Sequence, residues 1–173
     1  WELPLDRDSS WNAVLVPGVK PRGRWQHAAV FDPVSRRMFL DGGLIGSVPT
    51  DEVWILETDG PLRWRQLVGV EGPQPPPRSS HAAVLDAVAR RMLVFFQSSA
   101  PHSGFVAWAL SLDGAPRWDS LRVEGEQPPN GWGKSAVYDP DHHRVFLFGG
   151  SAKAAPTYWV LDLKSHPPRW TEV

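Results

Sequence analysis

The amino-acid sequence predicts an all-β fold built from tandem, four-stranded antiparallel units. The first observation is a repeated segment: residues 27–32 return as residues 81–86 and, more loosely, as residues 134–139, at steps of 54 and 53 residues. A fixed period of this length is typical of repeat architectures. The second observation is that eight of the ten tryptophans keep the same interval. They form two series, which are Trp1, Trp54, Trp108 and Trp159, and Trp11, Trp64, Trp118 and Trp170. Because their period is that of the repeat, we expect both series to pack between neighbouring units.

Each unit divides into four short strands, named a to d in chain order. In the first complete unit, strand a is a run of small residues (27–32) and strand b is strongly apolar (37–43). Strand c surrounds the first tryptophan of the unit, and strand d opens at the second. Strands a and b lack the alternation of polar and apolar residues that marks a half-exposed strand, so we expect neighbouring sheets to cover both of their faces.

Turn-forming residues separate the strands and leave no room for long helices. The a-to-b connections read Asp-Pro-Val-Ser-Arg-Arg, Asp-Ala-Val-Ala-Arg-Arg and Asp-Pro-Asp-His-His-Arg, and these residues favour tight turns. Because the strands are antiparallel, the d-to-a and b-to-c connections should emerge on one face and the other connections on the opposite face. The first set is longer and richer in Gly and Pro, and comprises residues 43–50, 70–77, 97–103, 123–130 and 150–156.

Composition excludes several classes of function. The formal net charge of −1 and the pI near 6.7 give no basic surface for nucleic acid or for an anionic membrane. No apolar run approaches the roughly 20 residues that cross a bilayer, so we expect neither partner. The chain has no cysteine, which excludes disulfides, thiolate metal sites and cysteine nucleophiles.

Four motifs within the repeat resemble the kelch family over nearly the whole chain. They are Arg-x-x-His at residues 24–27 and 78–81, Gly-Gly at the end of strand b, Asp-x-Val-Trp at residues 51–54, and the Trp that opens strand d. The resemblance implies a β-propeller with four-stranded blades. Residues 109–118 further resemble bacterial kelch arrays related in fold to the central domain of galactose oxidase. Because such bacterial relatives are often exported, this implies a secreted or periplasmic location.

Some positions depart from the kelch pattern. The third unit has Gly131 and Lys134 where the other units have Arg and His, and the second has Phe96 and Gln97 in place of Gly-Gly. The first unit has Asp41 where a Phe is usual. These departures put individual positions in doubt, and the predicted fold stays the same.

The repeat predicts about three and a half blades. Residues 1–20 would supply strands c and d of a leading blade, and residues 21–74, 75–128 and 129–173 would form three further blades. A propeller ring needs about four to eight blades. We therefore expect a fragment of a larger ring, monomeric within a longer chain. Two copies that close one ring are the alternative, in which each copy would bring an unmatched pair of strands c and d.

The candidate binding site lies on the face with the long connections, where strand a of each blade should start near the axis. Long loops on a rigid scaffold commonly carry recognition. The candidate residues are Arg24, Trp25, His27, Arg78, Ser80, His81, Trp132 and Lys134. For the repeated Arg and His residues, the alternative is that they tie one blade to the next by hydrogen bonds. Trp25 and Trp132 lie outside the two tryptophan series, and either form exposed platforms or plug the channel.

The sequence predicts no catalytic residue, no metal site and no cofactor. Asp139, Asp141, His142 and His143 crowd one turn, but adjacent side chains in a tight turn rarely converge on one ion. Copper chemistry of the galactose oxidase type needs a Tyr cross-linked to Cys, and no Cys is present. We expect a non-catalytic module that binds a protein segment or a carbohydrate. The alternative is part of the propeller of a secreted or periplasmic sugar-modifying oxidase or epimerase, whose catalytic residues lie outside this chain.

Overall fold

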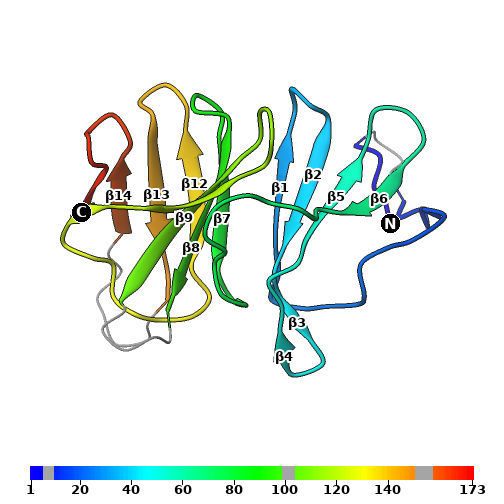
Figure 1. The fold of residues 1–173 in the computed structure, drawn as a ribbon, viewed down its shortest axis with the longest axis horizontal. Coiled ribbons are helices and arrows are strands. Elements are labelled where there is room, and N and C mark those ends of the chain that lie inside the picture. Colours follow the sequence, from blue (N-terminus) through cyan, green and yellow to red (C-terminus); the bar gives the residue numbers. More distant parts are fainter. Residues whose placement is uncertain (6–9, 99–103, 151–157) are drawn as a thin grey trace.

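The computed structural model describes residues 1–5, 10–98, 104–150 and 158–173, and in these residues it is all-β. Three four-stranded sheets stand side by side (Figure 1). Blade 1 contains β1 (Ala28–Asp32), β2 (Arg37–Asp41), β5 (Val53–Glu57) and β6 (Arg63–Gln66). Blade 2 contains β7 (Ala82–Asp86), β8 (Arg91–Gln97), β9 (Phe105–Ser111) and β10 (Trp118–Leu121). Blade 3 contains β12 (Ser135–Asp139), β13 (Arg144–Phe148), β14 (Tyr158–Asp162) and β15 (Arg169–Glu172).

Within each blade the strands lie in chain order and pair antiparallel, as the repeat predicts. Two short additions decorate this pattern. A hairpin of β3 (Leu44–Ile45) and β4 (Val48–Pro49) extends the b-to-c connection of blade 1. A short strand, β11 (Glu124–Gly125), joins the outer edge of blade 3 by pairing parallel to β15. The predicted strands a to d are therefore confirmed in all three complete units.

An aspartate at the end of strand a organises each a-to-b turn. Asp32 accepts hydrogen bonds from the backbone N–H of Val34 and Ser35, at 3.1 and 3.3 Å. Asp86 and Asp139 do the same in their own turns, at 3.1 and 3.2 Å. Such side-chain bonds stabilise a turn in place of backbone pairing. The turn closes with a residue in the left-handed region, and that residue is Arg36, Arg90 or His143, with φ of 53°, 52° and 51°.

The apolar core lies between the blades. Val30, Phe39, Val53 and Ile55 of blade 1 pack against residues of blade 2 that include Met92 and Trp118. The second junction places Leu93 and Phe95 against Val145, Leu147 and Trp170. Trp118 and Trp170 are almost fully buried, and burial of a side chain of this size contributes at least about 2 kcal/mol to folding. Trp118 and Trp170 of strand d therefore pack between blades, as predicted from their period, whereas Trp64 is only partly buried.

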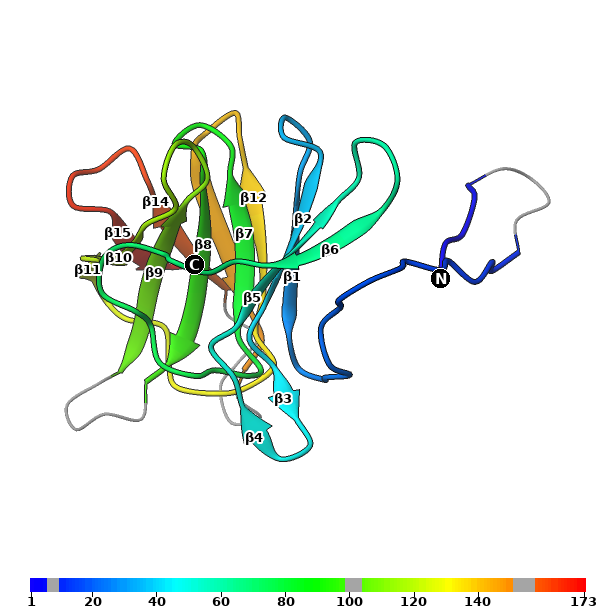
Figure 2. The ribbon, with the colours of Figure 1, turned by 45° about the vertical axis from the view of Figure 1, so that its right-hand side comes forward.

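The leading segment does not pack in this way. Its only recorded pairing among the described residues joins Glu2 and Asn12 through two backbone hydrogen bonds of 2.9 Å. Trp1 and Trp11 are 80% and 64% exposed, because no strands a and b lie beside them. Figure 2 shows this segment extending away from the blades. Membership of residues 1–20 in a leading blade stays a prediction.

No helix among the described residues has both the length and the apolar character that a bilayer crossing requires.

Candidate functional site

The long connections and the a-to-b turns lie at opposite ends of the blades. In Figure 1 the β3–β4 hairpin points down, whereas the β1–β2 and β12–β13 turns point up. The start of strand a, which carries all eight predicted site residues, belongs to the lower end. Two of the predicted loops, 97–103 and 150–156, lie mostly outside the described residues.

Arg78 and His81 form a buried charge cluster with Asp41 of the preceding blade. The Arg78 guanidinium donates two hydrogen bonds to the Asp41 carboxylate, one of them 2.7 Å from Nε to Oδ2. His81 Nε2 lies 2.9 Å from the same Oδ2. Burial alone would raise the pKa of Asp41, but Arg78 and His81 together lower it below its usual value. All three side chains are buried, so this cluster joins blades 1 and 2.

Arg24 makes a similar bond within its own blade. Its side chain is buried, and it donates to Glu52 Oε2 at 2.6 Å and to the Gly42 carbonyl at 3.2 Å. The same carboxylate oxygen accepts a 2.9 Å hydrogen bond from the Trp54 indole. Burial favours protonation of Glu52, but the bonds from Arg24 and Trp54 prevail and lower its pKa. Arg24 therefore has few donors left for a ligand.

Lys134 occupies the position of His81 in blade 3. It is buried, its Nζ donates to the Gly149 carbonyl at 3.2 Å, and it lies 5.3 Å from the centroid of the Phe105 ring. Burial lowers the pKa of Lys134. Phe95 stands where blade 1 has Asp41, so this junction has no carboxylate at that position, and the aromatic face beside Lys134 is that of Phe105.

The other four predicted residues are accessible. Trp25 and Trp132 are 55% and 79% exposed, His27 is exposed, and Ser80 is partly buried. Trp25 is held in place, because its indole donates a 2.9 Å hydrogen bond to the Gly46 carbonyl of the β3–β4 hairpin. Partial burial and the nearby Arg24 charge lower the pKa of His27, which favours the neutral imidazole.

A pocket of about 350 Å³ lies where the starts of strands a meet. Gln26, Ser79, Ser80 and Trp132 line it, and the Ser80 amide donates a 2.9 Å hydrogen bond to the Gln26 carbonyl across the two blades. We call these four residues and the adjacent Trp25 the mouth. The lining combines hydroxyl and amide groups with one large indole, a set suited to hydrogen bonding and stacking.

Sequence reasoning missed Gln26 and Ser79 as members of the mouth. The signal was a backbone constraint: Gln26, Ser80 and Gly133 occupy equivalent positions and all adopt positive φ, at 55°, 53° and 70°. The glycine in the third unit marks the left-handed conformation that this position needs. Sequence reasoning also missed Asp41 and Glu52 as the partners of the repeated arginines.

Polar side chains of the crowded turn at 139–143 bond within the turn and to the neighbouring blade. His142 Nδ1 lies 3.0 Å from Asp139 Oδ2, and His143 Nε2 lies 3.0 Å from Asp86 Oδ1 of the neighbouring blade. Arg144 donates a 2.9 Å hydrogen bond to Asp139. Within the described part of the chain, no group of three or more His, Asp or Glu residues is placed to hold a metal ion.

Comparison with known proteins places the chain within much longer relatives. No family model matches. Multiple epidermal growth factor-like domains protein 8 of Rattus norvegicus is 32% identical over 90% of this chain and 6% of its own length. The leucine-zipper-like transcriptional regulator 1 homolog of Drosophila melanogaster is 30% identical over 96% of this chain and 17% of its own length. The chain thus spans less than a fifth of either relative.

Among solved structures, the periplasmic gluconolactonase PpgL of Pseudomonas aeruginosa is similar, with a TM-score of 0.49 and 19% identity over 83% of this chain and 42% of that chain. The relatives with similar sequences are kelch-repeat proteins, and the match extends over most of the chain. The three blades have the strand order that this family requires. The chain therefore belongs to the kelch-repeat β-propellers.

Proposed function

We propose that this chain is a non-catalytic binding module whose mouth takes a protein segment. The single observation that carries the proposal is the exposure of two indoles at the mouth: Trp132, which is 79% exposed and lines the pocket, and Trp25, which is 55% exposed and precedes the lining residue Gln26. Binding of proteins is the usual role of kelch-repeat propellers, which supports the same conclusion.

The two tryptophans suit the role of anchors. Burial of an indole against a partner removes a large apolar area from water, and tryptophan is enriched among the residues that dominate binding energy. Trp25 is already fixed by its bond to Gly46, so binding would cost little side-chain entropy at this position. Trp132 forms one wall of the pocket, where a bound side chain would contact it.

The charges of the site indicate the chemistry of the ligand. Arg24, Arg78 and Lys134 are buried against Glu52, Asp41 and the Gly149 carbonyl, and His27 has a lowered pKa. The five described residues of the mouth therefore include no cation for a strongly acidic peptide. We expect it to select a neutral segment with an apolar or aromatic side chain for the indoles and backbone amides for Ser79, Ser80 and Gln26.

A binding screen tests the proposal. The chain and the Trp25→Ala/Trp132→Ala variant are applied to a random peptide array and to a glycan array. We expect the chain to retain a set of neutral peptides and the variant to lose about 90% or more of that signal, because loss of an anchor of this kind costs about 2 kcal/mol or more.

The matched control is Trp1→Ala/Trp11→Ala, which removes two indoles of comparable exposure away from the mouth and should leave the signal unchanged. Equal loss in both variants would show non-specific adhesion through exposed tryptophan. Binding to glycans alone would exclude a protein segment as the ligand.

A further inference from the structure

A second pocket, of about 270 Å³, lies between blades 1 and 2 and shares no residue with the mouth. One wall comes from β2, β5, β6 and the residues that follow β6, and the other from the c-to-d connection of blade 2. Arg37 directly follows the a-to-b turn of blade 1, so the pocket lies toward the upper end of the blades in Figure 1. Asp113 belongs to the c-to-d connection, but its carboxylate lies 3.4 Å from Arg90 Nε and does not line the pocket.

The lining contains two arginines and no acidic residue. Arg65 Nε donates a 2.8 Å hydrogen bond to Glu57 Oε1, and Arg37 Nε lies 3.7 Å from the same oxygen. Arg63 Nη2 lies 3.6 Å from Glu57 Oε2, so a single carboxylate faces three guanidinium groups. The bond from Arg65 and the charges of Arg37 and Arg63 lower the pKa of Glu57, as a positive local potential requires.

Arg37 lacks the partner that its counterparts have. Arg91 of blade 2 and Arg144 of blade 3 donate hydrogen bonds of 2.8 and 2.9 Å to the aspartate that ends strand a of their own blade. In blade 1 this aspartate is Asp32, and its two oxygens accept 2.7 Å bonds from Arg90 of the next blade. The Arg37 side chain makes no hydrogen bond to the part of the chain that the structure describes, so its donors are available to a ligand.

The inner end of the pocket is apolar. Phe39 and Ile55, which are 4% and 2% exposed, close it against the core between the blades. Leu67 of blade 1 and Leu112 of blade 2 line it and are only partly buried, so their side chains keep surface that a ligand can cover. The pocket thus combines cations with an apolar body.

The second junction lacks this combination. Asp119 is the counterpart of Arg65 in the strand register, and it pairs with Arg117 at 3.1 Å. Leu163, the counterpart of Leu112, is 3% exposed and belongs to the core. The two cations and the partly exposed leucine therefore belong to the first junction and do not follow from the repeat alone.

We infer that this pocket binds a small organic carboxylate, with the charge at Arg37 and Arg65 and the apolar body against Leu67 and Leu112. A planar guanidinium matches a carboxylate with two parallel hydrogen bonds, and burial of a ring or short alkyl chain adds an apolar gain. The volume of about 270 Å³ is just below the range of pockets that hold drug-sized ligands, which fits a single ring. This inference concerns the first junction and does not depend on the proposed function.

A titration with phenylacetate tests the inference. The amide resonances of Val68, Leu112 and Gly114 in the ¹⁵N-labelled chain should shift with saturation, at a Kd of about 1 mM or below for a ligand of this size. Phenylacetamide lacks the charge and acetate lacks the ring, so each should bind about tenfold or more weakly. Acetate, inorganic phosphate or phenylacetamide that binds as tightly as phenylacetate would overturn the inference, as would binding of an acidic peptide alone.

Two variants test the role of the charges. Arg37→Gln/Arg65→Gln should weaken phenylacetate binding about tenfold or more, because it removes both cations. Val68→Glu keeps both arginines and places a carboxylate at the rim, where Val68 is 74% exposed, so like-charge repulsion should also weaken binding. The matched control, Arg117→Gln/Arg122→Gln, removes the same charge from exposed side chains of blade 2 and should leave the Kd unchanged. Unchanged binding in the first two variants, or an equal loss in the control, would contradict a site at Arg37 and Arg65.

Discussion

Asp41 and Arg78 connect blades 1 and 2 at a position where the next junction has Phe95 and Gly131. One junction thus contains a buried ion pair, whereas at the other Phe95 packs against Trp170, with ring centroids 5.7 Å apart. A buried pair gains Coulomb energy but loses the hydration of both charges, so the pair as a whole often adds little stability. Removal of one partner is different, because the other charge then remains buried without compensation.

We predict that Arg78→Met lowers the free energy of unfolding by about 3 to 5 kcal/mol, because it leaves the Asp41 carboxylate buried without its main partner. Asp41→Leu/Arg78→Met should recover most of this loss, since two apolar side chains replace the pair. Urea unfolding of the unmodified chain, of Asp41→Leu and Arg78→Met alone, and of the double variant gives the coupling energy between the two side chains. A double variant as unstable as Arg78→Met would show that two apolar side chains cannot replace the buried Asp41–Arg78 ion pair.

The lowered pKa values of three buried aspartates determine how the free energy of unfolding should depend on pH. The hydrogen bonds from Arg90 hold the pKa of Asp32 well below its usual 3.8, and Arg78 and Arg91 help to lower those of Asp41 and Asp86 against the effect of burial. A carboxylate whose folded-state pKa is lowered stabilises the fold above its unfolded pKa, and this stabilisation is lost as the pH falls. We predict that the free energy of unfolding decreases steadily from about pH 5 to about pH 2. Urea titrations across this range measure it, and a flat profile would contradict the prediction.

At the scale of the element, the segment that precedes strand a of blade 2 or blade 3 pairs with strand d at the outer edge of the same blade. The Glu71 amide donates a 2.9 Å hydrogen bond to the Pro116 carbonyl, and the Trp118 amide donates one of 2.9 Å to the Glu71 carbonyl. Glu124 repeats the first bond with Pro168 at 2.8 Å. The next residue is Gly72 or Gly125, where any Cβ would collide with the carbonyl of Trp118 or Trp170.

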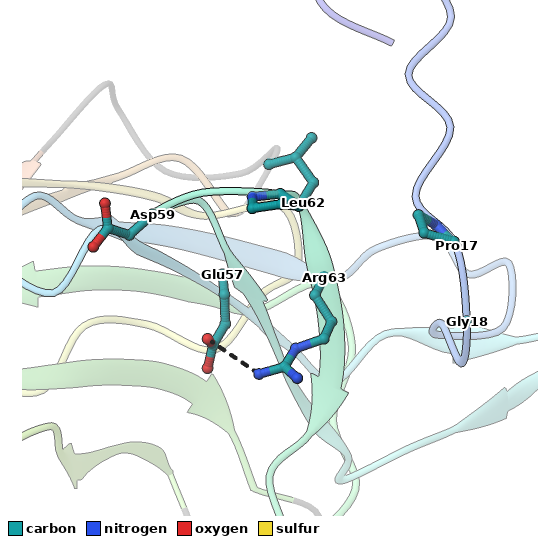
Figure 3. Close-up of a pocket in the computed structure, with 7 residues that line it drawn as sticks. Pro17, Gly18, Glu57, Asp59, Leu62 and Arg63 are labelled. Atoms are coloured by element: carbon teal, nitrogen blue, oxygen red, sulfur yellow. Dashed lines mark ion pairs between the residues drawn. The ribbon is translucent and has the colours of Figure 1, made fainter.

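In blade 1 the equivalent residues are Pro17 and Gly18, and neither of these bonds forms among the described residues. Proline has no N–H to donate. Gly18 keeps the left-handed conformation of its counterparts, with φ of 85°, but nothing lies near it. A cavity of about 490 Å³ separates Pro17 from Leu62 and Arg63 of the c-to-d connection and β6 (Figure 3).

We predict that Pro17→Ala lets this segment pair with β6, because the new amide can donate to the Leu62 carbonyl and the Trp64 amide can donate to residue 17. Hydrogen exchange of the Trp64 amide should slow about fivefold or more, as expected for a bond worth about 1 kcal/mol. Pro21→Ala is the control outside the pairing. Exchange that slows equally in the control, or that remains fast when Pro17 is replaced, would show that proline is not the cause.

At the scale of the whole molecule, the period of the sequence was sufficient to predict the three blades, their strand order and the burial of Trp118 and Trp170. Burial of each candidate residue was not predictable, because it depends on which side chain faces it across a junction. Arg78 is buried because Asp41 departs from the repeat, and Arg24 because Glu52 lies in the same blade. Trp25 and Trp132 remain exposed because they lie outside the periodic series. An enzymatic role for a longer protein stays a prediction about residues beyond these blades.

The measurement that tests the central claim most directly is a titration of the ¹⁵N-labelled chain with the strongest peptide from the array, followed through the indole N–H resonances of its ten tryptophans. Each resonance is assigned by a Trp→Phe variant. The account predicts that the resonances of Trp25 and Trp132 shift with saturation, while those of Trp118 and Trp170, buried between blades, stay in place. Shifts confined to Trp1 and Trp11, or none at the mouth, would contradict it.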